Sequence, residues 1–216
     1  VEWIEPSAMA VASYNDYDTT LEADRMMVLE GQLRNLGISD WQKAGYNGKG
    51  VRIAILDVGF DRADHVPAFD HIRNEKRLIA TRDFTSRKYS ENVYYGNGHG
   101  TEVWSCIGGK IGDLQIGLAT GAEFLLAKTE KNSEKYAEEL YWLAAAEWAD
   151  KNGADIINSS LGYTSKRYFN WQMDGKTTFV TRAANIAARK GMLVVNAAGN
   201  EGTDKWHYIG APADAD

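Results

Sequence analysis

Three polar side chains that lie far apart in the chain could together catalyse acyl transfer. They are the carboxylate of Asp57, the imidazole of His99 and the carboxamide of Asn200. An imidazole serves as a general base when a carboxylate selects its tautomer and stabilises the imidazolium that forms during attack. A side-chain amide can donate a hydrogen bond to the oxyanion that develops on the attacked carbonyl. Asp57 and His99 are therefore candidates for a base and its orienting group, and Asn200 for the oxyanion donor.

Each of these residues also has an ordinary structural explanation. A carboxylate such as Asp57 at the end of a strand can cap a loop or a helix, and an isolated histidine is often a hydrogen-bonded structural residue. Asn200 can simply form a turn after a glycine. The glycines on both sides of His99, Gly98 and Gly100, let another backbone or a substrate approach closely. The presence of all three chemical types favours the catalytic interpretation, which requires the fold to bring them together.

The elements that would position these residues alternate between strands and helices. Short apolar runs typical of buried strands occur at 51–56, 122–128, 154–159 and 192–196. Helical periodicity occurs at 21–36, 133–151 and 177–190, and these ranges are closed by Gly37, Gly153 and Gly191. Ser133 is the expected N-cap of the second helix. Continuous apolar strands separated by helices indicate a parallel sheet covered on both faces. The predicted fold class is therefore α/β, a doubly wound and mostly parallel sheet with helices on both faces.

In a doubly wound sheet, chemistry collects beyond the carboxyl ends of the strands. Asp57 directly follows the first predicted strand, 158–162 covers the end of the third, and 196–200 covers the end of the fourth. The segment 97–103, in which His99 opens a helical pattern, lies between the first two predicted strands. A carboxylate, an imidazole and a carboxamide are therefore expected at one edge of the sheet.

Composition excludes several other classes of protein. The chain has 216 residues, and its 24 Lys and Arg against 30 Asp and Glu give a net charge of −6, so no basic field exists to bind nucleic acid. The single cysteine, Cys106, cannot form an internal disulfide, and its position suggests a small buried apolar side chain. No run of 18 apolar residues occurs, so no transmembrane segment is expected.

Four short motifs occur in order on the predicted elements: Asp-x-Gly at 57–59, His-Gly-Thr at 99–101, Ser-Leu-Gly at 160–162 and Ala-Ala-Gly-Asn at 197–200. This order resembles the subtilases, the subtilisin-like serine peptidases. The resemblance runs from about residue 28 to the end, and residues 1–6 are similar to the last strand of the family's inhibitory pro-region. It implies that 1–20 is the end of a pro-region or an N-terminal linker. It also implies that 21–216 is the N-terminal part of a peptidase domain.

The resemblance assigns a role to each motif. Asp57 would orient the histidine, His99 would act as general base and acid, and Asn200 would hold the oxyanion. Two further groups are implied to bind a peptide substrate. Ser160, Leu161 and Gly162 would offer backbone groups to an extended peptide, and Ala197, Ala198 and Gly199 would wall the pocket for the residue before the scissile bond.

The chain departs from the family pattern at several positions. Val58 stands where the family usually has a hydroxyl residue, Trp104 where a small residue is usual, and Thr120 where proline is usual. The family's nucleophile lies in a Gly-Thr-Ser stretch that is expected beyond Asp216, and none of the serines present has that context. This chain alone is therefore expected to be inactive, and the C-terminal remainder of the same domain is an expected partner. The alternative is a non-catalytic, peptide-binding member of the fold.

No metal site or cofactor is predicted from the residues. The acidic and histidine residues Asp61, Asp64, His65, Asp70 and His71 match no zinc spacing. Calcium stabilises many subtilases, so the resemblance allows a calcium site, but it assigns no ligands in this sequence. Catalysis by the implied triad requires no cofactor. By the same resemblance, the protein is expected to be secreted or to reside in the cell envelope.

Overall fold

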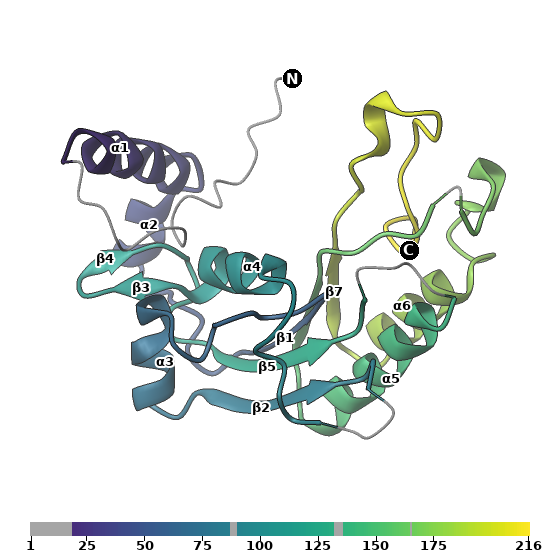
Figure 1. Ribbon diagram of the computed structural model, residues 1–216, viewed down its shortest axis with the longest axis horizontal. Helices are drawn as coiled ribbons and strands as arrows, with labels where there is room; N and C mark the ends of the chain where they lie inside the picture. The colour runs from purple at the N-terminus through teal and green to yellow at the C-terminus, as the bar shows by residue number, and fades with distance from the viewer. Residues whose placement is uncertain (1–18, 87–89, 132–135, 165) are drawn as a thin grey trace.

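The computed structural model describes residues 19–86, 90–131, 136–164 and 166–216. Its centre is a five-stranded parallel sheet in the order β2-β5-β1-β6-β7 (Figure 1). The strands are β1 (Arg52–Asp57), β2 (Leu78–Asp83), β5 (Glu123–Lys128), β6 (Ile156–Ser159) and β7 (Leu193–Asn196). A small antiparallel hairpin pairs β3 (Lys110–Ile111) with β4 (Leu114–Gln115). The predicted parallel α/β fold is confirmed, and β2 is a strand that the apolar runs did not reveal.

Helices cover both faces of this sheet. α3 (Asp70–Asn74) and α4 (His99–Gly108) pack on one face, and α5 (Glu138–Lys151) and α6 (Phe179–Arg189) pack on the other. α1 (Thr19–Asn35) and α2 (Ile38–Lys43) contact each other to one side of the sheet (Figure 1). The predicted helix at 133–151 is observed from Glu138 onward, whereas its proposed cap, Ser133, lies outside the described residues. The segment 1–20 also lies outside them, except for the two threonines that begin α1.

The alternation of side chains along β1 and β5 creates two separate cores. Ile53 and Ile55 of β1 pack with Phe124 of β5 and Trp104 of α4 on one face. Ala54, Leu56 and Leu125 face the other way, toward the aromatic and alanine residues of α5 and α6. Because successive side chains in a strand point to opposite faces, Asp57 falls on the α4 side with Ile53 and Ile55. The carboxylate that ends β1 therefore lies on the side of the sheet that α4 covers.

Two side chains of α4 differ in their burial, and one of them corrects an expectation. Trp104 is fully buried and stacks on Phe69 with ring centroids 3.8 Å apart, so it is a core residue. Cys106, expected to be buried, is exposed. The buried face of α4 is formed by Gly100, Thr101, Trp104, Ser105 and Gly108. Cys106 lies off that face because each helical residue turns about 100° from its neighbour.

The edge strand β7 carries large apolar side chains that are open to solvent. Leu193 is 59% exposed and Val195 is 48% exposed. Ile186 of the adjacent helix α6 is 47% exposed. These residues leave a partly uncovered apolar surface at one end of the sheet. Among the described helices, none combines the length and the apolar character needed to cross a membrane.

Candidate active site

The carboxylate of Asp57 lies at the carboxyl end of the central strand β1. Its side chain is fully buried, and Oδ1 accepts a hydrogen bond of 2.7 Å from the backbone N–H of Val58. Val58 lacks a hydroxyl, so it supports the carboxylate through its backbone alone. Burial raises the pKa of Asp57, and this effect is opposed by the hydrogen bond from His99 and the N–H of Val58.

His99, the first residue of α4, pairs with this carboxylate. Its Nδ1 lies 2.9 Å from Oδ1 and 3.0 Å from Oδ2 of Asp57. An ionised carboxylate only accepts hydrogen bonds, so Nδ1 carries the proton and Nε2 keeps its lone pair. The side chain of His99 is 46% exposed, which leaves Nε2 able to meet a reactant. The hydrogen bond to Asp57 raises the pKa of His99 above its ordinary value of 6.5.

Gly100 allows the start of α4 to approach β1 this closely. Its N–H donates to the carbonyl of Gly59 at 2.9 Å. A Cβ at position 100 would lie 2.5 Å from that carbonyl oxygen and 2.9 Å from Cβ of Asp57. The backbone N–H of His99 donates to Oδ1 of Asn97 at 2.8 Å, which fixes the turn into the helix. The histidine is therefore held by its backbone on one side and by Asp57 on the other.

The predicted peptide-binding segment follows β6 at the same edge. The carbonyl of Leu161 accepts a hydrogen bond of 2.9 Å from the side chain of Asn196, and Tyr163 forms a bridge to Ala211. Within the described ranges, the backbone N–H and C=O groups of Ser160 and Gly162 have no intramolecular hydrogen-bond partner. Gly162 is exposed, and a Cβ there would meet open space. An extended peptide could therefore add as a strand along 160–162.

The second predicted segment follows β7. Ala197 donates to the carbonyl of Ser159 at 3.0 Å, and the carbonyl of Ala198 accepts from Gly210 at 3.0 Å. Gly199 adopts a positive φ of 111° and turns the chain into Asn200, which is exposed. The two segments thus lie side by side beyond β6 and β7. Within the described part of the chain, the carboxamide of Asn200 forms no hydrogen bond with Asp57 or His99.

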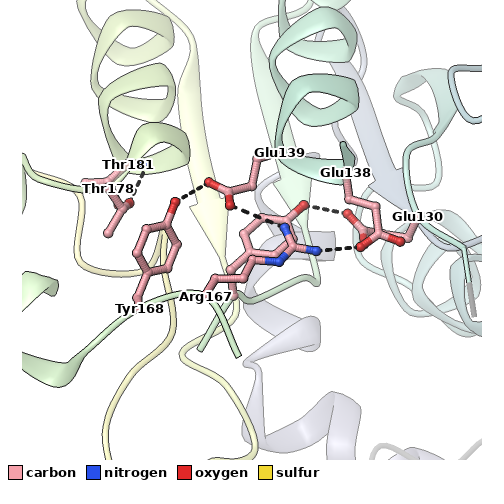
Figure 2. A network of polar contacts seen from close by, with 8 residues as sticks. Glu130, Glu138, Glu139, Arg167, Tyr168, Thr178 and Thr181 are labelled. Carbon is pink, nitrogen blue, oxygen red and sulfur yellow. Dashed lines mark hydrogen bonds and ion pairs between the residues drawn. The ribbon is translucent and has the colours of Figure 1, made fainter. Parts of the chain in front are cut away.

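A buried polar network lies at the same end of the sheet, among the segments that follow β5 and β6 (Figure 2). The guanidinium of Arg167 forms ion pairs with Glu138 at 2.7 Å and Glu139 at 3.3 Å, and its side chain is only 5% exposed. Tyr168 donates to Glu139 at 2.5 Å. Tyr163 donates to Glu130 at 2.5 Å. The network therefore joins the segment after β5, the start of α5 and the segment after β6.

One carboxyl of this network holds its proton at neutral pH. Burial and the neighbouring Glu138 raise the pKa of Glu130 to about 9. The neutral carboxyl can hydrogen-bond to Glu138 while it accepts from Tyr163. Sequence reasoning missed these residues because their contacts join positions about 30 residues apart that share no motif, such as Tyr163 and Glu130. The one feature of the sequence that could have indicated this network is the pair of adjacent acids at the start of α5, Glu138 and Glu139.

The acidic and histidine residues at 61–71 do not converge on one point. No group of three or more His, Cys, Asp or Glu side chains suited to a metal ion occurs in the residues that the structure describes. His65 lies 3.4 Å from Asp64 and is largely exposed. Asp70 pairs with Arg73 within α3.

Comparison with known proteins places this chain in a family. A profile of the subtilase family, peptidase S8, matches residues 48–216. Minor extracellular protease Epr of Bacillus subtilis (strain 168) is 32% identical over 165 residues, which are 76% of this chain and 22% of that protein. Subtilisin DY of Bacillus licheniformis is 30% identical over 178 residues, 81% of this chain and 57% of that protein. The chain therefore spans only part of each relative's length.

Solved structures agree with this assignment. The crystal structure of MycP1 with its N-terminal propeptide removed superposes with a TM-score of 0.58 at 25% identity, over 80% of this chain and 49% of that one. The prenylagaramide maturation protease PagA shares the fold with a TM-score of 0.57 at 22% identity, over 82% of this chain and 55% of that one. Taken with the ordered motifs and the match over 48–216, these similarities show that the chain belongs to the subtilase family.

Proposed function

We propose that this chain is the N-terminal part of the catalytic domain of a serine endopeptidase that cleaves peptide substrates by acyl transfer. The subtilase family consists of serine proteases, so membership of this family indicates a protease. The main support for endopeptidase catalysis by acyl transfer is the Asp57–His99 pair. Its two side chains are 2.9 Å apart, and the imidazole is half exposed.

In the proposed mechanism, Nε2 of His99 takes the proton from a serine hydroxyl as its oxygen attacks the scissile carbonyl. Asp57 holds Nδ1–H and stabilises the imidazolium. Asn200 would donate to the oxyanion, and His99 would then protonate the leaving amine, which releases the new N-terminus. Water, activated by the same imidazole, would hydrolyse the acyl-enzyme. Every proton in this scheme passes through one ring nitrogen.

The nucleophilic serine is proposed to lie beyond Asp216. Among the described serines, Ser159 is buried and accepts a hydrogen bond from Trp142 at 3.0 Å, and Ser105 donates to a carbonyl within α4. No hydroxyl of the described residues hydrogen-bonds to Nε2 of His99. Residues that follow 216 would also cover the exposed apolar surface of β7, so they are the proposed partner of this piece.

Three further features are proposed on the strength of the family. Residues 1–20 would end an inhibitory pro-region, so the protein would be made as a zymogen. Export to the cell envelope or the medium is supported by a relative named as an extracellular protease. No cofactor is needed for the proposed chemistry, and calcium would serve stability alone.

A non-catalytic peptide-binding role is the alternative, favoured by one observation. Val58 offers Asp57 only a backbone N–H, with no hydroxyl to hold the second carboxylate oxygen. Hydrolysis of a fluorogenic peptide library by the full-length protein decides between the two functions. The proposal predicts turnover that falls by about 10⁴-fold or more in a His99→Ala variant. Binding of peptides without turnover would favour the alternative.

A further inference from the structure

A cavity of about 450 Å³ lies directly beside the Asp57–His99 pair. Val58 and Asn97 form part of its wall, together with Tyr95. Val58 follows Asp57 in the chain, and the carboxamide of Asn97 accepts the backbone N–H of His99. The cavity is therefore lined by residues that adjoin Asp57 in the chain and hold the backbone of His99.

A buried lysine lines the cavity. Lys128 ends β5 in register with Asp57 of β1, so both side chains point to the α4 face of the sheet. Only 7% of Lys128 is exposed. Its ammonium lies 3.9 Å from the centre of the Tyr95 ring and donates to the carbonyl of Tyr95 at 3.4 Å. An ammonium has three donors, so two remain for a ligand. Within the described part of the chain, Lys128 forms no ion pair with a carboxylate.

The groups around this lysine act on its pKa in both directions. Burial lowers the pKa of Lys128 below its ordinary value of 10.5, and Lys131 acts the same way, whereas Asp83, its neighbour on β2, and Asp61 oppose this effect. The Asp83 carboxylate already accepts hydrogen bonds from the N–H and hydroxyl of Thr85 at 2.7 Å and 2.8 Å, and from the hydroxyl of Tyr95 at 2.5 Å. Asp83 is not one of the residues that line the cavity.

Of the two other acidic or basic residues of the lining, one is neutral and the other adds a positive charge. Glu130 contributes a carboxyl that is neutral at pH 7, because its pKa is raised to about 9. Lys131 contributes a second ammonium at the exposed rim. The cavity is therefore electropositive in a chain whose net charge is −6.

We propose that this cavity binds the carboxylate of an aspartate or glutamate side chain next to the scissile bond, with Lys128 as the residue that determines this specificity. The inference rests on the proposed function, since it describes the substrate of the same site. In an extended peptide, alternate side chains point to the same side, so a residue flanking the scissile bond can enter the cavity while its backbone lies along 160–162. The carboxylate would replace water on a preformed, largely buried ammonium.

The test uses the full-length protein and a set of fluorogenic peptides in which a single glutamate, glutamine or lysine is moved through each position flanking the cleavage site. At one position, kcat/KM for glutamate should exceed that for glutamine by about tenfold or more. This ratio is the expected contribution of one charge-assisted hydrogen bond. Lys128→Met should bring this ratio to about one. Lys128→Glu should reverse the preference in favour of lysine.

Two controls separate charge from damage to the fold. Lys128→Arg should keep most of the preference for glutamate. Lys49→Met removes an exposed lysine at the opposite end of β1 and should leave the ratio unchanged. Because each ratio is measured within one variant, it does not depend on the fraction of folded enzyme.

Efficient cleavage with equal rates for glutamate and glutamine at every position would overturn the inference and leave the proposed function intact. A preference that survives Lys128→Met would also overturn it. Failure of the wild-type protein to cleave any peptide would refute the proposed function and this inference together.

Discussion

The Asp57–His99 pair determines how the protein should respond to pH. His99 acts as a base only when it is neutral, so activity should rise with pH through a midpoint above 6.5, because Asp57 raises the pKa of the imidazole. Asp57→Asn removes the negative charge, so the pKa of His99 falls and the midpoint moves to lower pH. The same change should reduce kcat by about 10⁴-fold, because asparagine no longer holds His99 in the tautomer that leaves Nε2 free to accept a proton. The kcat/KM profile of both full-length proteins measures this shift, and an unmoved midpoint would contradict the pairing.

Gly100 offers a second test at the scale of single residues. Gly100→Ala forces a Cβ against the carbonyl of Gly59 and the side chain of Asp57, so α4 must move and His99 must leave its partner. We expect a loss of about 100-fold or more in kcat/KM, since misplacement by about 1 Å has that effect.

The neighbouring glycine provides the matched control for that variant. Gly98→Ala places a methyl where no atom lies within 4 Å, at a φ of −91° that alanine adopts readily. Equal activity in the two alanine variants, measured with the same peptide, would show that close packing at position 100 is not needed.

Among the elements, the buried network ties the loop after β5 to α5 and to the loop after β6. Glu130 retains its proton up to about pH 9 in the folded protein but loses it near 4.5 when unfolded. The unfolded state therefore binds fewer protons between these values, and the free energy of unfolding falls as pH rises, by up to about 1.4 kcal/mol per pH unit from this group. Above about pH 9, the stabilisation that protonated Glu130 gives the folded state is lost.

Glu130→Gln should flatten that decline, because glutamine keeps the hydrogen bond from Tyr163 and does not ionise. Urea denaturation of the full-length protein at pH 5, 7 and 9 measures the effect. Glu147→Gln, an exposed position on α5, is the control. If the free energy of unfolding of the Glu130→Gln variant falls with pH as steeply as that of the control, Glu130 does not carry the buried proton.

The sequence could predict the elements whose signals are local. The apolar runs of β1 and β5 indicate central strands, and the glycines after α5 and α6 mark where those helices stop, with φ of 72° at Gly153 and 104° at Gly191. The strand β2 escaped because it is only partly buried and carries polar residues, so its apolar run is broken. The sequence also did not predict that Lys128 lines the cavity, because this depends on the register between β5 and β1.

For the whole molecule, the exposed apolar side chains of β7 predict how this piece behaves alone. Leu193 and Val195 lie on an edge strand that could pair with another chain. Expressed by itself, residues 1–216 should aggregate, or form a stable complex when mixed with the C-terminal remainder of the domain. Size-exclusion chromatography with light scattering measures both outcomes. A soluble monomer with a sharp melting transition would contradict this expectation.

The central claim is that His99, oriented by Asp57, activates a serine supplied by the rest of the domain. Labelling the full-length protein with a fluorophosphonate probe and locating the adduct by mass spectrometry tests that claim most directly. We predict one modified serine on the C-terminal side of Asp216, and loss of labelling in His99→Ala. An unlabelled wild-type protein, or labelling that persists without His99, would contradict the account.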